Sequence, residues 1–236
     1  MVAQVTAVTV DAAGLETREV NRAIKRAITE GATDVRVRDP AGRHSFGVAL
    51  KGQAHVVFEG PTGWYAAGMN YGPRIVIEGN TGWGLAECMM DGQVEVHGHA
   101  GSGAAASIRG GLVYVAGDAG ARAGIAMKGG TLIVGGDVGY MTGFMMQRGT
   151  IVACGDAADG IGDSMYDGTI YVGGSTASRG ADAEIEELTD EDRISLKELL
   201  DPFGIDAGTI DFTKIRSGRK LWNFSTKEPE LWTSAL

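Results

Sequence analysis

The sequence predicts an all-β solenoid, a right-handed parallel β-helix of about seven coils with 19 residues each. Three observations lead to this fold class: glycine at a constant step, an apolar β-branched triplet in every repeat, and a second apolar column half a repeat away. A repeat of this size cannot bury its apolar side alone, and stacked repeats build a continuous core. At about 4.8 Å per stacked strand, such a solenoid extends roughly 34 Å.

The glycine series defines the repeat. Glycine makes up 38 of the 236 residues, against a usual share of roughly 7%. One series with a step of 19 supplies the glycines that we expect to turn the chain after each strand: Gly60, Gly79, Gly98, Gly117, Gly136, Gly155 and Gly174. Glycine adopts positive φ without steric cost, so we expect these turns to use that freedom.

An apolar triplet stands before each of these glycines, separated from it by one residue. The outer two residues of each triplet are apolar, whereas the centre also accepts Glu95, Tyr114 or Tyr171. This alternation predicts a short strand whose ends face inward and whose centre faces outward. The second apolar column is expected to fill the interior and consists of Met89, Ile108, Met127, Met146 and Met165. Small residues one position earlier are expected to let the wall bend: Cys88, Ser107, Ala126 and Ser164.

The segments on either side are expected to cover the open ends of the solenoid. Apolar residues at helical spacing predict a helix between 17 and 30 that ends at Gly31, and a short strand follows at 35–37. Residues 181–200 are rich in acids and predict an amphipathic helix or helix pair, followed by an extended tail. The expected organisation is a helix–strand cap over 1–45, the solenoid over 46–177 and a helical and extended cap over 178–236.

Composition and motifs exclude several classes of function. A net charge of −9 without a basic stripe argues against nucleic-acid binding. The chain has no apolar run of membrane-spanning length, and its two cysteines and its start favour the cytoplasm. Dinucleotide, phosphate-loop and nucleophile-elbow motifs are absent. We therefore expect no catalytic residue, no bound cofactor and no metal site in this chain.

Two sets of polar residues are candidates for a site. His97 and His99 form a close pair without further ligands at metal spacing, so a locally bonded turn is favoured over a metal site. A polar column follows the turn glycines and consists of Asn80, His99, Asp118, Asp137 and Asp156. Turn residues that bond the local backbone are favoured there over a cation or substrate ladder.

Cysteines and tryptophans are the other candidates. Cys88 and Cys154 occupy different positions of the repeat and are interpreted as packing residues. Trp64 and Trp83 occupy one position in successive coils, where they either stack on each other or form a patch for a partner. The C-terminal Trp222 and Trp232 need a surface to bury against, and a partner chain is favoured over the solenoid.

The repeat, with its Gly-Asp-Ala-Gly and Gly-Asp-Val-Gly turns, resembles the C-terminal β-helical domain of the large subunit of glutamate synthase. The similarity continues in Asn21-Arg22-Ala23-Ile24 and in residues 41–47, so it covers roughly residues 15–177. The segment 215–222 is similar to free-standing members of this family. The resemblance implies a free-standing subunit, because the glutaminase and flavin domains of glutamate synthase are not in this sequence.

Free-standing domains of this kind occur in N-methylglutamate synthase, so the resemblance implies a non-catalytic scaffolding subunit of such a complex. A glutaminase-like amidotransferase subunit and a subunit with FMN and iron–sulfur clusters would be its partners and carry the chemistry. One alternative is another glutamate-synthase-type assembly. A second is the glycine-rich β-helical subunit of formylmethanofuran dehydrogenase or of the formyltransferase/hydrolase complex, which has a similar repeat. A free-standing β-helical enzyme or carbohydrate binder is a further alternative.

Overall fold

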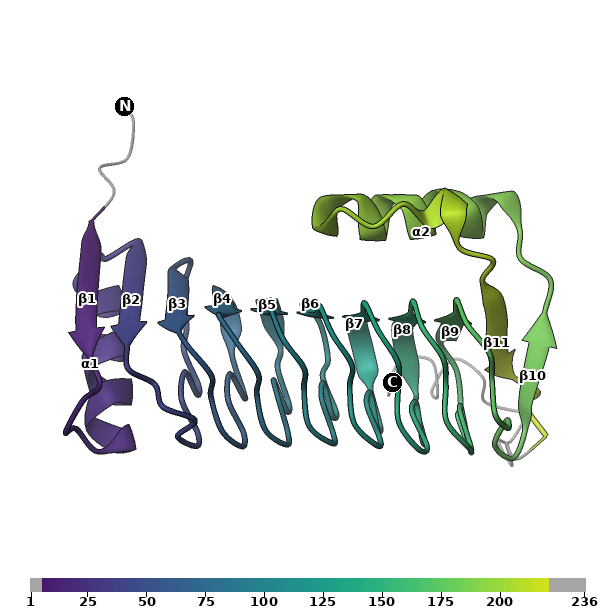
Figure 1. Cartoon of the computed structure of the whole chain (residues 1–236), viewed down its shortest axis with the longest axis horizontal. Coiled ribbons are helices and arrows are strands. Elements are labelled where there is room, and N and C mark those ends of the chain that lie inside the picture. Colours follow the sequence, from purple (N-terminus) through teal and green to yellow (C-terminus); the bar gives the residue numbers. More distant parts are fainter. Residues whose placement is uncertain (1–5, 221–236) are drawn as a thin grey trace, which may run out of the picture.

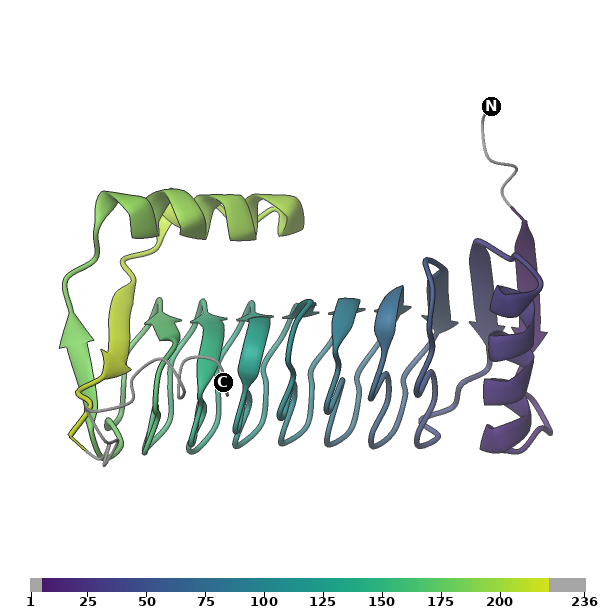
Figure 2. The same ribbon diagram turned by 180° about the vertical axis from the view of Figure 1, so that it is seen from behind.

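The computed structural model describes residues 6–220 and forms a parallel β-solenoid of about seven turns with two α-helices (Figures 1 and 2). The predicted fold class is confirmed. The strands form one sheet in the order β1-β2-β3-β4-β5-β6-β7-β8-β9-β11-β10. They are β1 (Ala7–Asp11), β2 (Asp34–Arg38), β3 (His55–Glu59), β4 (Tyr71–Ile77), β5 (Asp91–Val96), β6 (Leu112–Val115), β7 (Lys128–Val134), β8 (Arg148–Ala153), β9 (Thr169–Val172), β10 (Ala183–Glu186) and β11 (Thr213–Ser217). The helices are α1 (Thr17–Thr29) and α2 (Asp190–Leu200).

The step of 19 in the sequence is the spacing between stacked coils. From β3 to β9 all neighbouring strands are parallel, and each triplet residue lies beside its equivalent one repeat later, as Val56 does beside Ile75. On another side of the coil, single parallel bridges connect Thr81, Ala100, Ala119, Val138, Ala157 and Thr176 in turn. Each repeat is therefore bonded to the next on at least two sides.

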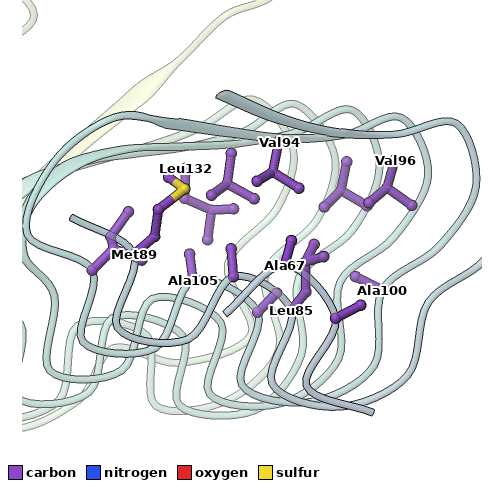
Figure 3. Packing of buried hydrophobic residues seen from close by; sticks show 14 of the residues in the cluster. Ala67, Leu85, Met89, Val94, Val96, Ala100, Ala105 and Leu132 are labelled. Carbon is purple, nitrogen blue, oxygen red and sulfur yellow. The ribbon is translucent and has the colours of Figure 1, made fainter. Parts of the chain in front are cut away.

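The two apolar columns that the sequence predicts line the interior, together with further buried residues, such as Leu85 and Ala100, that it does not predict. Figure 3 shows Val94 and Val96 on the strand side of the interior and Met89 and Leu85 on the other walls. The second column is fully buried, since Met89, Ile108, Met127 and Met146 have no exposed surface and Met165 is 1% exposed. Unbranched methionine fits this space because its flexible side chain adapts to irregular gaps.

The bend in the wall before this column is made by residues with left-handed backbone. In one coil Gly84, Ala86 and Cys88 have φ values of 70°, 55° and 57°. The small residues predicted to allow the bend all share this conformation, with φ between 52° and 57° at Cys88, Ser107, Ala126 and Ser164. This backbone costs about 1–2 kcal/mol for a residue with a Cβ. Met145, at the same position of the repeat, has a φ of 53°, so a small side chain is not required for the bend.

The turn glycines are required for a different reason from the one expected. Their φ lies in the left-handed region at Gly60 and Gly79 but outside it at the five later turns. There the coils approach so closely that a Cβ on Gly155 would lie 2.2 Å from Asp137 Oδ1 and 2.8 Å from the carbonyl carbon of Gly136. A Cβ added at Gly98, Gly117, Gly136 or Gly174 would lie similarly close to atoms of the preceding coil. The expectation of positive φ is therefore wrong for these five turns, and close stacking explains the glycine.

Helix α1 covers the N-terminal end of the interior with Val20, Ile24 and Ala27. Asn21 fixes the helix to the first coil: its Nδ2 donates to the Ser45 carbonyl at 2.7 Å, and its Oδ1 accepts from the Gly47 N–H at 2.9 Å. The predicted strand at 35–37 is present in β2 and pairs with β3. Strand β1, which the sequence analysis does not predict, pairs with β2 and is the outermost strand (Figure 1).

The C-terminal segment is only partly as predicted. Helix α2 begins at Asp190, and the residue before it, Thr189, caps the helix: its Oγ1 accepts from the Asp192 N–H at 3.2 Å. Residues 183–186, which the sequence predicts to be helical, form strand β10. Strand β11 pairs antiparallel with both β9 and β10, so β10 and β11 together cover the last coil. The helix does not cap the end but lies along the outer face of the sheet (Figures 1 and 2). The expected helical end cap is therefore wrong.

Candidate interaction surface

An exposed aromatic stack runs along the first coils. The His44 ring lies 4.6 Å from the Trp64 ring with the planes 9° apart, and the Trp64 ring lies 5.5 Å from the Trp83 ring at 18°. The glycine before each tryptophan makes room for the stack, since a Cβ on Gly82 would lie 2.4 Å from Trp64 Cδ1. Of the two arrangements left open by the sequence, stacking is present, yet Trp64 and Trp83 remain 46% and 58% exposed.

Further large apolar side chains are exposed on the same coils. Tyr65 and Met69 are half exposed, and together with Val48, Gly68, Ser45, Glu87 and Cys88 they line a groove of about 300 Å³. We call Trp64, Tyr65, Met69 and Trp83, with this groove, the aromatic patch. Large exposed apolar side chains gathered on one part of a soluble protein mark interaction sites, and tryptophan, tyrosine and methionine are enriched at interfaces. The aromatic patch is therefore suited to contact with another protein.

The polar column after the turn glycines is part of the stacking. Each side chain accepts the backbone N–H of its equivalent in the next coil: Asn80 from His99, His99 Nδ1 from Asp118, Asp118 from Asp137, Asp137 from Asp156, and Asp156 from Ser175, at 2.7–3.0 Å. The role is structural, as favoured from the sequence, but the expected bonds to the local backbone are wrong, because each bond reaches the coil 19 residues away. Among residues 6–220, no three histidine, cysteine or acidic side chains, His97 and His99 included, are grouped for a metal ion.

The outer face of the sheet is covered by α2 over the later coils and not over the first ones. The outward centres of the triplets are Val57, Val76 and Glu95 in the first coils and Tyr114, Ile133, Val152 and Tyr171 in the later ones. The later group is covered by α2 and the segment after it, where Leu196 and Leu200 are buried and the Phe203 ring stacks on Tyr114 at 3.9 Å. The centres do face outward as predicted, but half of the sheet carries a second core.

A hydrogen-bonded cluster at β9 fixes α2 over this face. Asp192 accepts from the Tyr171 hydroxyl at 2.5 Å and from Lys214 Nζ at 2.9 Å, and the Asp192 and Lys214 side chains are only 12% and 11% exposed. Burial opposes ionisation of Asp192, but the hydrogen bonds from Tyr171, Thr189 and Lys214 outweigh it and hold the pKa of Asp192 well below its ordinary value. Burial and the bond to Asp192 raise the pKa of Tyr171. The cluster is thus a structural link between the helix, β9 and β11.

The two cysteines lie in different surroundings, and both are free. Cys154 packs against the covered outer face, as predicted, and burial raises the pKa of its thiol to about 11. Cys88 is exposed in the groove of the aromatic patch, so its interpretation as a packing residue is wrong. Its backbone, held in the left-handed bend, directs the side chain to the surface and not into the core.

This difference predicts selective labelling of the two thiols. Because the thiolate is the reactive form, we expect a maleimide at neutral pH to modify Cys88 at least about tenfold faster than Cys154. Peptide mapping of the folded protein after short exposure measures both rates. A Cys88→Ser variant should then stay almost unlabelled until denaturant is added, and rapid labelling of that folded variant would contradict the burial of Cys154.

The sequence matches no family model and no curated protein. Within the described part of the chain, neither helix combines the length and the apolar character needed to cross a bilayer. The fold and the surface define a parallel β-solenoid with an exposed aromatic patch at its first coils. The other predicted partner contacts, Trp222 and Trp232, lie outside the described residues and stay a prediction.

Proposed function

We propose that this chain is a non-catalytic scaffolding subunit of a glutamate-synthase-type complex, most like N-methylglutamate synthase. That reaction converts glutamate and methylamine to N-methylglutamate and ammonia. A glutaminase-like amidotransferase subunit and a subunit with FMN and iron–sulfur clusters would carry the chemistry in the cytoplasm, while the solenoid holds the two in register. The resemblance of the repeat and of residues 41–47 to the β-helical domain of glutamate synthase supports this choice of partners.

The residues of the resemblance have a physical role that fits this proposal. Asn21 lies in the segment that resembles glutamate synthase, and its two hydrogen bonds join α1 to the backbone of Ser45 and Gly47 in the other resembling segment. Arg43 in the same segment donates to the carbonyl oxygens of Leu15 and Asp39. The shared residues therefore build the start of the solenoid, on which the aromatic patch is placed.

The exposed aromatic patch is the observation that carries the proposal. Two stacked indoles, with Tyr65 and Met69 beside them, stay in water on the isolated chain. Covering apolar surface stabilises a complex by about 25 cal/mol per Å² before the costs of association. A rigid stack also loses little conformational freedom on binding, since stacking already restricts the side chains. A partner that covers Trp64 and Trp83 would gain a preformed contact.

Substitution of both indoles tests this role. When the tagged full chain is co-expressed with the two proposed partners, Trp64→Ser combined with Trp83→Ser should weaken retention of at least one partner by about a hundredfold, in the range of interface hot spots. Ile194→Ser is the matched control, because Ile194 is 60% exposed on α2 and away from the patch. We expect it to leave the complex intact. Full retention of both partners by the folded double variant would contradict the proposal.

A further inference from the structure

The N-terminal end of the sheet has a free edge. Strand β1 is the first strand of the sheet order, and within residues 6–220 it pairs on one side only, with β2 (Figure 1). An unpaired edge strand presents N–H and C=O groups that accept a further strand. From this edge we infer that the chain forms a two-fold dimer in which β1 pairs antiparallel with β1 of a second copy. This inference is independent of the proposed function.

The hydrogen bonds of β1 identify the free groups. The Thr6 carbonyl accepts from β2, through the N–H of Thr33 and Asp34, and the Ala12 N–H donates to the Arg38 carbonyl. Successive residues of a strand direct their backbone groups to opposite sides. The even-numbered residues therefore bond to β2, and Ala7, Thr9 and Asp11 direct their N–H and C=O groups to the free edge.

These three residues are self-complementary in an antiparallel pair. With the two-fold axis at Thr9, Thr9 lies opposite Thr9 of the second copy, and Ala7 lies opposite Asp11. All three positions then form hydrogen-bonded pairs, as their free groups require. No like charges stand directly opposite each other, and the Thr–Thr pair is a favourable cross-strand contact. A shift of the pairing by one residue would place β2-bonded residues at the new interface. A shift by two residues keeps free groups opposite each other but leaves only two of the three residues of β1 paired, so the register centred on Thr9 uses the most free groups.

The space beside β1 fits the inward side chains of such a strand. A groove of about 420 Å³ lies between β1 and α1, and its lining includes Val8, Val10, Leu15, Ala23 and Ala27. The second β1 would bring its own Val8 and Val10 over this groove. On the helix side the lining is Ala23, Arg26, Ala27 and Glu30. The two short alanine side chains leave room for the second strand, and the two-fold axis brings Arg26 and Glu30 of both copies to the rim, where charges of opposite sign are available to pair.

The opposite edge of the sheet favours this end for association. Strand β10 carries Glu184 and Glu186 among its four residues, and Lys220 pairs with Glu184. Charged side chains on an edge strand discourage addition of another strand. Strand β1 has one charge, Asp11, and its carboxylate accepts from the nearby Ala13 N–H at 3.0 Å. The occupant we infer for the free edge is therefore a second β1.

The test measures the mass of the full chain in solution. Sedimentation equilibrium over roughly 1–100 µM should give twice the 24.6 kDa mass of one chain at the higher concentrations. Thr9→Pro removes an N–H that faces the free edge and leaves the bonds to β2, whereas Thr9→Lys sets two like charges opposite each other. Each should raise the dimer dissociation constant at least about tenfold. Thr9→Val keeps the backbone and shape, and should stay within about threefold of the wild type.

The two Thr9 variants and amide exchange together decide whether β1 pairs with a second copy. If Thr9→Pro fails to fold by circular dichroism, Thr9→Lys carries the test because it changes no backbone group. A monomeric wild type at all concentrations, or a dimer that is insensitive to both variants, would overturn the inference. Amide exchange gives a second readout: the Thr9 N–H should become protected as the concentration rises. Protection of that N–H in a monomer would show that another segment of the same chain covers the edge, which also overturns it.

Discussion

Gly155→Ala is expected to destabilise the solenoid by about 3 kcal/mol, although it adds only one methyl group. The new Cβ would meet both the Asp137 carboxylate and the backbone of Gly136 in the preceding coil, so a change of side-chain rotamer cannot relieve the contact. The coils must separate, or the hydrogen bond from the Asp156 N–H to Asp137 must break. Thermal or denaturant unfolding of the full chain measures the loss.

Gly103→Ala is the matched control. Gly103 has a φ of 72°, but a Cβ there would find its nearest neighbour at 3.9 Å, and Ala105 in the same bend already has a φ of 58°. We expect this variant to cost about 1 kcal/mol, the strain of a left-handed alanine. Equal losses for the two variants would contradict close stacking as the reason for glycine at position 155.

Asp192→Ala is expected to weaken the docking of α2 by about 3 kcal/mol, because it leaves the buried Lys214 ammonium without its close partner and the Tyr171 hydroxyl without its acceptor. Glu186 Oε2, at 3.8 Å from Lys214 Nζ, compensates only in part. Amide exchange within α2 should accelerate more than exchange within β3–β8. Asp190→Ala is the control in the same helical turn, since Asp190 is exposed, and it should change exchange little.

The pKa values of this cluster also set its pH range. The pKa of Asp192 is lowered on folding, so its contribution is complete above about pH 4, the unfolded pKa, and decreases as the pH falls below it. The pKa of Tyr171 is raised, so its contribution is complete below about pH 10 and decreases above it. The protection of the α2 amides, measured as their exchange rate relative to an unstructured chain at the same pH, should be greatest between these limits. An acid dependence that Asp192→Ala leaves unchanged would contradict the assignment.

The part of the fold that could be predicted from the sequence is the part that repeats. Seven equivalent triplets average out the local variation, so the coil length and the inward columns are clear from spacing alone. Strand β1 is a single stretch of five residues without an equivalent, and its pairing with β2 depends on α1 between them. The residues of β10, Ala-Glu-Ile-Glu, share the acidic composition of the helix that follows, and only pairing with β11 makes them a strand.

The candidate surface was predictable to a similar degree. Trp64 and Trp83 are one repeat apart, so their stacking follows from the period. Tyr65 and Met69 have Gly84 and Cys88 as equivalents in the next coil, so no column indicated them. Two partners of Asp192, Tyr171 and Lys214, lie 21 and 22 residues away, and three-dimensional packing alone brings them to it. The one signal was Tyr171, a polar residue at the centre of an otherwise apolar triplet.

Native mass spectrometry of the untagged full chain, co-expressed with a glutaminase-like subunit and an FMN- and iron–sulfur-binding subunit, tests the scaffolding role most directly. We expect one assembly that contains all three polypeptides, with the flavin retained by the FMN-binding subunit when the assembly is dissociated. The scaffolding role is contradicted if this chain stays apart from both folded partners, or if it alone retains flavin and turns over substrate.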